Sequence, residues 1–226
     1  MDSAETPHRS AAAPTGVARL VVAPAVATLA VTLLRLVGEL QGWSSTFFSR
    51  APGGGGSIVG IAWLVPVFGA WFGWSLGRRG QEPARLGRAF GLVVAAIAAL
   101  PASGLLAVRA GLGAEELRML YVYAVVAVAG TALAARAWPL LGRVLLVYGL
   151  AARVPVALVM LAAMLGSWGT HYDVAPPGLP AMSVGARWLA IGLLPQLTVW
   201  LWFTVAIGML FGLAAGALGR RRAPSA

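Results

Sequence analysis

Arg153 is the residue whose position most strongly indicates a function. It lies roughly thirteen residues from either end of an apolar segment at 140–165, near the middle of a helix that rises 1.5 Å per residue. If this segment crosses a bilayer, a central arginine costs about 2.5–3.5 kcal/mol to insert, so it should face the protein interior and meet a partner, water or an anionic ligand. We predict a ligand-binding or transport role for Arg153, and a structural ion pair is the alternative.

A polar stripe runs along the first apolar segment of the chain. It consists of Thr28, Thr32, Arg35 and Glu39. The spacings of four, three and four residues place these side chains on one face of a helix. Such a face could form the wall of a cavity that opens to the outside, where Arg35 and Glu39 would orient a ligand held by Arg153. In the alternative interpretation, Arg35 and Glu39 pair with each other at the membrane surface.

Two prolines inside apolar segments stand beside polar residues. Pro155 follows Arg153 by two positions, and Pro195 directly precedes Gln196. A proline frees a backbone carbonyl one turn earlier, and broken helices at mid-depth often form substrate sites in transporters. We therefore add Gln196, and Tyr148 from the segment of Arg153, to the candidate ligand-binding residues. Simple bending of the helices is the alternative.

His171 and Asp173 stand two positions apart in a turn-rich, aromatic segment at 167–178. The pair could supply an imidazole oriented by a carboxylate, a base that activates a nucleophile, or two metal ligands. His-x-Asp pairs in loops are more often ordinary turn and capping groups. We keep both residues as candidate catalytic residues and predict no metal site.

The composition predicts a membrane protein. Of 226 residues, 59% are hydrophobic and 11% are charged, whereas soluble domains average about 25% charged residues. Six segments approach the roughly 20 apolar residues that a membrane-spanning helix needs. They lie at 17–38, 58–77, 89–108, 119–137, 140–165 and 188–212. We predict an all-α integral membrane fold, with one six-helix transmembrane domain at 17–219 and polar tails at 1–16 and 220–226.

The arginines predict the orientation of the bundle, because positively charged loops stay in the cytoplasm. One side of the predicted bundle holds Arg9, Arg19, Arg78, Arg79, Arg85, Arg88, Arg136, Arg143, Arg220, Arg221 and Arg222, and the other holds Arg50, Arg109, Arg118 and Arg187. Both termini should therefore be cytoplasmic. The absence of Lys and Asn beside abundant Ala, Gly and Arg fits GC-rich coding, so we expect the cytoplasmic (inner) membrane of a bacterium.

Two of the apolar segments carry glycine at every fourth position. The stripes are Gly69, Gly73 and Gly77 in the second segment and Gly208, Gly212 and Gly216 in the sixth. Small residues let helices approach closely in lipid. Because both segments run in the same direction in the predicted topology, the stripes could pack on each other within one chain. A homodimer face or a moving seam in a transporter is the alternative.

Several kinds of chemistry are excluded by composition. The chain has no Cys and no Lys, which excludes disulfides, thiol nucleophiles, Schiff bases and the Walker lysine. It has only two His, so a three-histidine zinc site cannot form within one chain. The net charge of +10 is explained by topology and attraction to anionic lipid, and we predict no nucleic-acid binding. No motif identifies a cofactor.

Three functions fit these observations. The first is binding or transport of an outward-accessible anionic solute or lipid headgroup, held mainly by Arg153. The second is a membrane-embedded transferase or hydrolase that acts on a lipid-linked substrate through His171 and Asp173. The third is a non-catalytic assembly partner, in a homo-oligomer or with another subunit, that uses the glycine stripes. No motif in the sequence decides among them.

Overall fold

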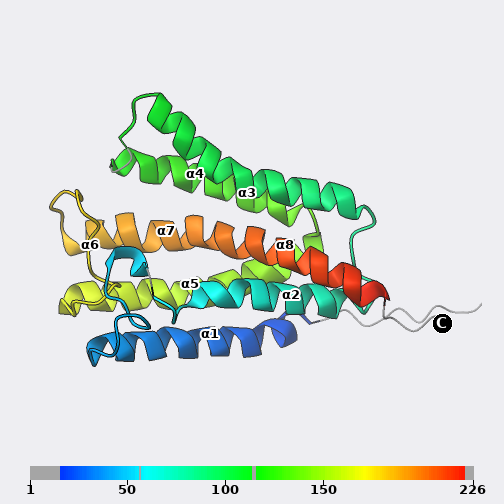
Figure 1. The fold of residues 1–226 in the computed structure, drawn as a ribbon, viewed down its shortest axis with the longest axis horizontal. Coiled ribbons are helices and arrows are strands. Elements are labelled where there is room, and N and C mark those ends of the chain that lie inside the picture. The colour runs from blue at the N-terminus through cyan, green and yellow to red at the C-terminus, as the bar shows by residue number, and fades with distance from the viewer. Residues whose placement is uncertain (1–15, 56, 114–115, 222–226) are drawn as a thin grey trace, which may run out of the picture.

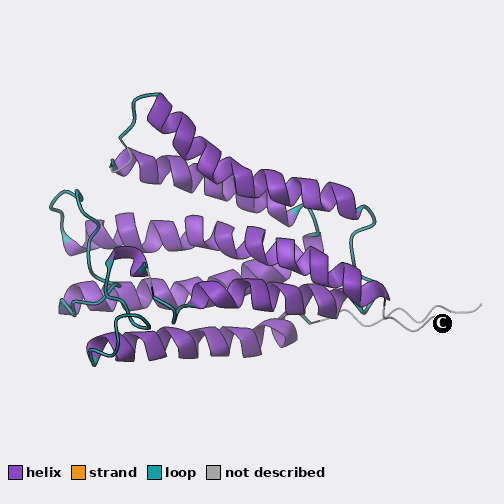
Figure 2. Ribbon diagram, viewed as in Figure 1, coloured by secondary structure: helices purple, strands orange, loops and turns teal. Residues whose placement is uncertain are grey.

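The fold is a bundle of long helices. The computed structural model describes residues 16–55, 57–113 and 116–221, and every regular element within these ranges is a helix (Figure 2). The predicted tails at 1–16 and 220–226 lie almost entirely outside the described residues. The long helices are α1 (Val17–Leu40), α2 (Leu64–Gly77), α3 (Leu86–Arg109), α4 (Leu117–Ala135), α5 (Pro139–Gly166) and α8 (Val199–Arg221).

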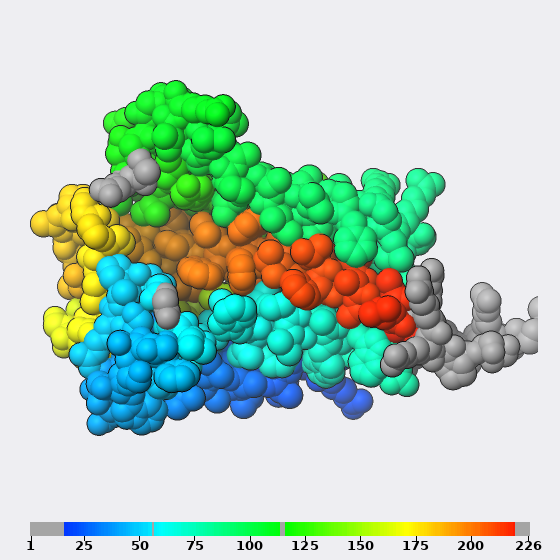
Figure 3. All heavy atoms as spheres, in the orientation of Figure 1, coloured from blue at the N-terminus to red at the C-terminus, as the bar shows by residue number. Residues whose placement is uncertain are grey.

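The bundle has two distinct ends. Figure 1 shows the start of α1 and the end of α8 at the same end, which we call the terminal end. The connecting segments 41–63 and 167–183 lie at the opposite end, which we call the loop end. The hairpin of α3 and α4 diverges from the other helices toward the loop end (Figures 1 and 3). Large apolar side chains on this hairpin, such as Leu106, Tyr121 and Val125, are exposed and would contact lipid in a membrane.

Five helical stretches are long and apolar enough to cross a membrane, which is what a multipass helical membrane protein requires. Four of them are α1, α3, α4 and α5. The fifth is the continuous run Val184–Gly219, which contains 36 residues and extends the segment expected at 188–212 in both directions.

The helix expected at 58–77 is shorter than the sequence suggested. A single 3-10 turn (Ile61–Trp63) precedes α2, so this apolar helical stretch covers only Ile61–Gly77. The residues before it include Gly53, Gly54 and Gly60, and glycine is a poor helix former. Gly53 and Gly54 have positive φ angles of 66° and 71°, and this part of the chain forms a loop at the loop end (Figure 1).

The two glycine stripes meet each other inside one chain. Gly69 lies against Gly208, Gly73 against Gly212, and Gly77 against Gly216. A Cβ atom added to any of the three α2 glycines would overlap the backbone of α8. Because no side chains separate them along this line, α2 and α8 pack with their backbones in contact, as small-residue stripes permit.

The run Val184–Gly219 is irregular where it approaches the loop end. It begins with α6 (Val184–Arg187), a π-helical turn (Trp188–Leu193) and α7 (Leu194–Leu197). Pro195 has no backbone N–H and disturbs the hydrogen bonds of the preceding turn, and π turns are frequent at functional sites. The backbone departs from helical geometry again at Thr198, where φ is −119° and ψ is −77°. Gln196 lies between these two irregular points.

Candidate functional site

A cavity of about 240 Å³ lies at the loop end, between α1, α5 and the irregular run that leads into α8. Residues of the segments 53–63 and 171–176 complete its lining. Its polar and charged lining residues are Thr32, Arg35, Ser57, Arg153, His171 and Gln196. Residues from separate parts of the sequence therefore share one cavity.

Arg153 is a buried charge that lacks an acidic partner. Only 3% of its surface is exposed. Its Nη2 donates to Thr204 Oγ1 over 3.4 Å, and its guanidinium lies 4.9 Å from the ring centre of Trp200. Its Nε has no hydrogen-bond partner, and no carboxylate of the described residues pairs with it. One weak hydrogen bond and a cation–π contact are therefore the close polar contacts that the described residues give it.

Gln196 is the second buried lining residue with an unsatisfied atom. It is 7% exposed, and its Oε1 has no hydrogen-bond partner among the described residues. Its Nε2 contacts the sulfur of Met160 on α5 at 3.8 Å. A buried carbonyl oxygen without a donor is unfavourable by about 1–3 kcal/mol, so this atom, like Arg153 Nε, can gain from a ligand in the cavity.

Glu39 does not line the cavity, but it holds two residues that do, Arg35 and His171. Its carboxylate is completely buried. It accepts a hydrogen bond from Arg35 Nε at 2.8 Å and one from the backbone N–H of His171 at 2.9 Å. Its Oε1 also lies 2.5 Å from Nδ1 of His171, and the guanidinium of Arg50 donates to its backbone carbonyl. One residue thus connects α1 to two loop-end segments.

Arg35 holds the loop that leads to α2. Besides its bond to Glu39, its Nη2 donates to the carbonyls of Ser49 at 3.2 Å and Gly54 at 3.1 Å. Gly54 must be glycine for two reasons. Its φ of 71° lies in the left-handed region, and an added Cβ would lie 2.7 Å from Arg35 Nη2 and 3.0 Å from the His171 ring.

His171 is held as a neutral, oriented imidazole. Burial lowers its pKa below the usual range, although the hydrogen bond to Glu39 opposes that shift. A neutral ring whose Nδ1–H donates to Glu39 leaves Nε2 as an acceptor, and no described residue bonds to Nε2. The ring packs on Tyr172 with a centroid separation of 3.8 Å. Burial also raises the pKa of Tyr172, whose hydroxyl donates to the carbonyl of Thr32 at 3.2 Å.

Asp173 forms local hydrogen bonds and does not orient the His171 ring. Its carboxylate accepts from the backbone N–H groups of Gly169 and Thr170 at 2.9 and 2.7 Å. It also accepts from Thr170 Oγ1 at 2.7 Å. These contacts use the Asp173 carboxylate to close a turn. The acid that bonds to the His171 ring is Glu39.

Tyr148 lies outside the cavity lining. Its hydroxyl forms a hydrogen bond of 2.9 Å with Thr28 Oγ1, and its ring packs edge-on against Phe68 and Phe72. Tyr148 is almost fully buried in this aromatic cluster. The structure therefore gives it a packing position, with its one polar group already bonded.

The described residues contain no cluster of three or more His, Asp or Glu side chains that could hold a metal ion. The acidic and imidazole groups at the loop end are also engaged with one another or with backbone groups. The cavity thus brings together one buried cation, Arg153, and one oriented imidazole, His171, a combination suited to holding an anion.

Two contributors to the cavity were not anticipated from the sequence. Trp200 stacks on Arg153, and Met160 contacts Gln196. The signal for both was present, because Met160 follows Arg153 by seven residues and Trp200 follows Gln196 by four. These spacings return to the same face of a helix.

The fold and the cavity define the class of this protein as a multipass helical membrane protein with a cavity that both charged and apolar residues line. No protein family, curated protein or solved structure matches the chain.

Proposed function

We propose that the protein binds an anionic solute or lipid headgroup in the loop-end cavity, and that Arg153 supplies the charge that holds it. The observation that carries this proposal is the isolation of Arg153. Arg153 is 3% exposed, and its Nε has no hydrogen-bond partner among the described residues. A buried charge is unfavourable unless it is paired, and an anion in the cavity would pair it.

The contrast with Arg35 supports this assignment. Arg35 also lines the cavity, but its Nε is paired with the buried carboxylate of Glu39 at 2.8 Å. Arg35 and Glu39 form a neutralised pair that shapes the cavity wall. Among the charged lining residues that the structure describes, Arg153 keeps an uncompensated positive charge, so it is the group to which an anion would be attracted. Transport would additionally need a movement that opens the cavity to the other side.

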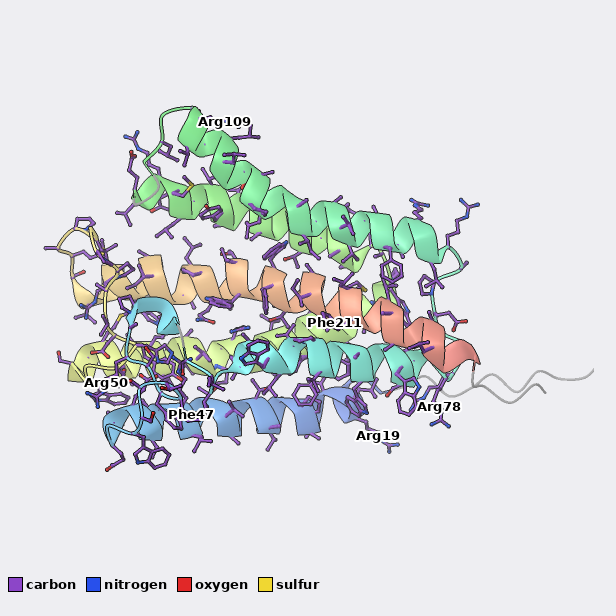
Figure 4. The ribbon with its side chains drawn as sticks, in the orientation of Figure 1. Arg19, Phe47, Arg50, Arg78, Arg109 and Phe211 are labelled. Atoms are coloured by element: carbon purple, nitrogen blue, oxygen red, sulfur yellow. The ribbon has the colours of Figure 1, made fainter. Side chains whose placement is uncertain are left out.

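We further propose six crossings of a bacterial inner membrane, with α2 as a short crossing and both termini in the cytoplasm. Figure 4 shows Arg19 and Arg78 at the terminal end and Arg50 and Arg109 at the loop end. The connection 78–85, with Arg78, Arg79 and Arg85, and the connection 136–138, with Arg136, lie at the terminal end, which the positive-inside rule assigns to the cytoplasm. The cavity would then face outward. Reporter fusions after Gly111 and at Ala226 test this orientation, and an external signal at Ala226 would reverse it.

The binding proposal is tested by calorimetric titration of the purified protein with three probes of one shape: butyrate, butyramide and butylammonium. Butyrate should bind best, and Arg153→Met should abolish its binding. Arg109→Met is the matched control, because Arg109 is an exposed arginine at the end of α3. Butyrate binding that survives Arg153→Met, or equal binding of the neutral amide, would contradict the proposal.

A second candidate function rests on the pair formed by Glu39 and His171. A buried carboxylate that bonds to Nδ1 of a cavity-lining imidazole is the arrangement by which general bases are oriented. We therefore keep a membrane-embedded transferase or hydrolase as the alternative, with Glu39 in the orienting role and Arg153 on the substrate phosphate. It predicts a pH-dependent activity on a lipid-linked substrate that His171→Ala abolishes; an activity unchanged by that substitution would exclude it.

The third function, an assembly partner, loses its main support. The glycine stripes that suggested a partner surface contact each other between α2 and α8. They are consequently not available as a surface for a second copy or another subunit.

A further inference from the structure

Two residues that line the cavity, Arg153 and Gln196, each carry an unsatisfied buried atom, and the two atoms are of opposite kind. Arg153 Nε is a donor without an acceptor, and Gln196 Oε1 is an acceptor without a donor, among the residues that the structure describes. Both side chains are more than nine-tenths buried, at 3% and 7% exposure. A simple anion would satisfy the first atom only. A ligand that satisfies both must offer an acceptor to Arg153 and a donor to Gln196.

Both side chains are held in place by their surroundings. The indole of Trp200 covers the guanidinium of Arg153, and Thr204 accepts a bond from it on a second side. The Nε2 of Gln196 is directed at the sulfur of Met160, so Oε1 is the atom of this amide that keeps an unused hydrogen-bonding position. Because Oε1 and Arg153 Nε are themselves buried, a ligand would reach them through small movements of these two cavity-lining side chains.

The charges around the cavity permit one negative charge on the ligand. Arg35 is paired with Glu39, and Nδ1 of His171 is bonded to the same carboxylate. Asp173 is bonded to the backbone of its own turn. The charge that remains uncompensated among the described lining residues is the single positive charge of Arg153. A monoanion neutralises it, whereas a dianion would bring an unpaired negative charge.

The remaining walls are apolar. Val31, Val156, Met160 and Ile191 contribute to the lining. At about 240 Å³, the cavity is also smaller than the roughly 300–1,000 Å³ of drug-sized sites. It suits a short apolar body attached to the anionic group better than a fully hydrated inorganic ion.

Resting on the proposed function, we infer that the ligand is a monoanion with an apolar body and a hydroxyl or N–H donor in addition to its anionic group. This chemistry occurs in soluble hydroxycarboxylates and in phosphodiester lipids with a hydroxylated headgroup. The anionic group contacts Arg153, the donor bonds to Gln196 Oε1, and the apolar body lies against α5.

Matched ligands isolate the donor. For the soluble form, 2-hydroxy-4-methylpentanoate is compared with 4-methylpentanoate, which lacks only the hydroxyl. For the lipid form, nanodiscs that contain phosphatidylglycerol are compared with nanodiscs that contain phosphatidylethanol, whose phosphodiester has no hydroxyl. Each pair is titrated into the full-length wild type, Arg153→Met, Gln196→Met and the control Arg109→Met.

The hydroxylated member of at least one pair should bind about three- to tenfold more tightly to the wild type, the contribution of one net hydrogen bond. Gln196→Met should lower the affinity for the hydroxylated member to that for its partner, and Arg153→Met should abolish binding of both members. Gln196→Glu, which keeps an acceptor oxygen but adds a negative charge, should weaken both members and retain the preference. The pair that shows the effect identifies a soluble or a lipid ligand.

Two results would overturn the inference in distinguishable ways. Anion binding that needs Arg153 but ignores the hydroxyl, or a preference that persists in Gln196→Met, would refute the ligand chemistry and leave the proposed function intact. Binding of every probe that is independent of Arg153, or no binding at all, would refute both.

Discussion

Replacing Arg153 by methionine should stabilise the protein in anion-free buffer. A central arginine costs about 2.5–3.5 kcal/mol to bury in a bilayer. Against this, the structure offers a 3.4 Å bond to Thr204 and a contact with Trp200, and a cation–π contact contributes about 0.5–2 kcal/mol. The difference predicts that Arg153→Met gains about 1–2 kcal/mol. Methionine keeps the length and flexibility of the side chain, so little packing is lost.

The same substitution at Arg35 should have the opposite effect. Arg35→Met would leave the completely buried carboxylate of Glu39 without its charged partner and would release Ser49 and Gly54. Breaking a buried pair costs about 3–5 kcal/mol. In thermal unfolding followed by circular dichroism, the melting temperature should rise by about 2–8 °C for Arg153→Met and fall for Arg35→Met. A fall for Arg153→Met as large as that for Arg35→Met would refute the view that Arg153 lacks a structural partner.

Three further predictions concern the framework of the site. Gly73→Ala should lower the melting temperature, because its Cβ would overlap the backbone of Gly212. The control Gly91→Ala lies in open space on α3 and should not lower it. Equal effects of the two substitutions would argue against the close packing of α2 and α8. Burial keeps the pKa of His171 low, so the unfolded chain, with a histidine pKa of about 6.5, binds more protons between the two values. The free energy of unfolding should therefore decrease as the pH falls through this window, and His171→Gln should abolish that dependence; an unchanged pH profile in the variant would show that another group is responsible. Asp173→Ala should raise the proteolytic sensitivity of the 167–183 loop without changing which anions bind, because its carboxylate bonds only within its turn; loss of anion selectivity would contradict this.

The helical periodicity of α1 was readable from the sequence. Thr28, Thr32, Arg35 and Glu39 were expected on one face, and all four side chains are buried. The position of Arg153 in the middle of a long helix was also predictable from the length of the apolar segment, since α5 runs from Pro139 to Gly166; its depth in a bilayer stays a prediction. The other residues on the same face of α5 could have been predicted too, since Val156 and Met160 follow Arg153 by three and seven residues and line the same cavity. Tyr148 precedes Arg153 by five residues, a spacing that turns it away from that face.

Other features depend on contacts that spacing along the chain does not encode. The sequence placed Asp173 beside His171, but the imidazole bonds to Glu39, which is 132 positions away. A short acid in a turn reaches its own backbone N–H groups more easily than a ring two residues away. α2 likewise starts later than the apolar pattern suggests. The glycines before it, such as Gly54, form a loop held by Arg35 and do not extend an apolar helix.

Native mass spectrometry of gently purified protein would show most directly whether Arg153 holds an anion, because it weighs whatever molecule is bound and does not require a chosen probe. Wild type, Arg153→Met and Arg109→Met would be released from detergent under identical conditions, and the mass and charge of any bound species determined. If Arg153 holds the ligand, a bound monoanion should be present in wild type and in Arg109→Met and missing in Arg153→Met. The same bound species in all three proteins, or none in any of them after reconstitution with candidate anions, would contradict it.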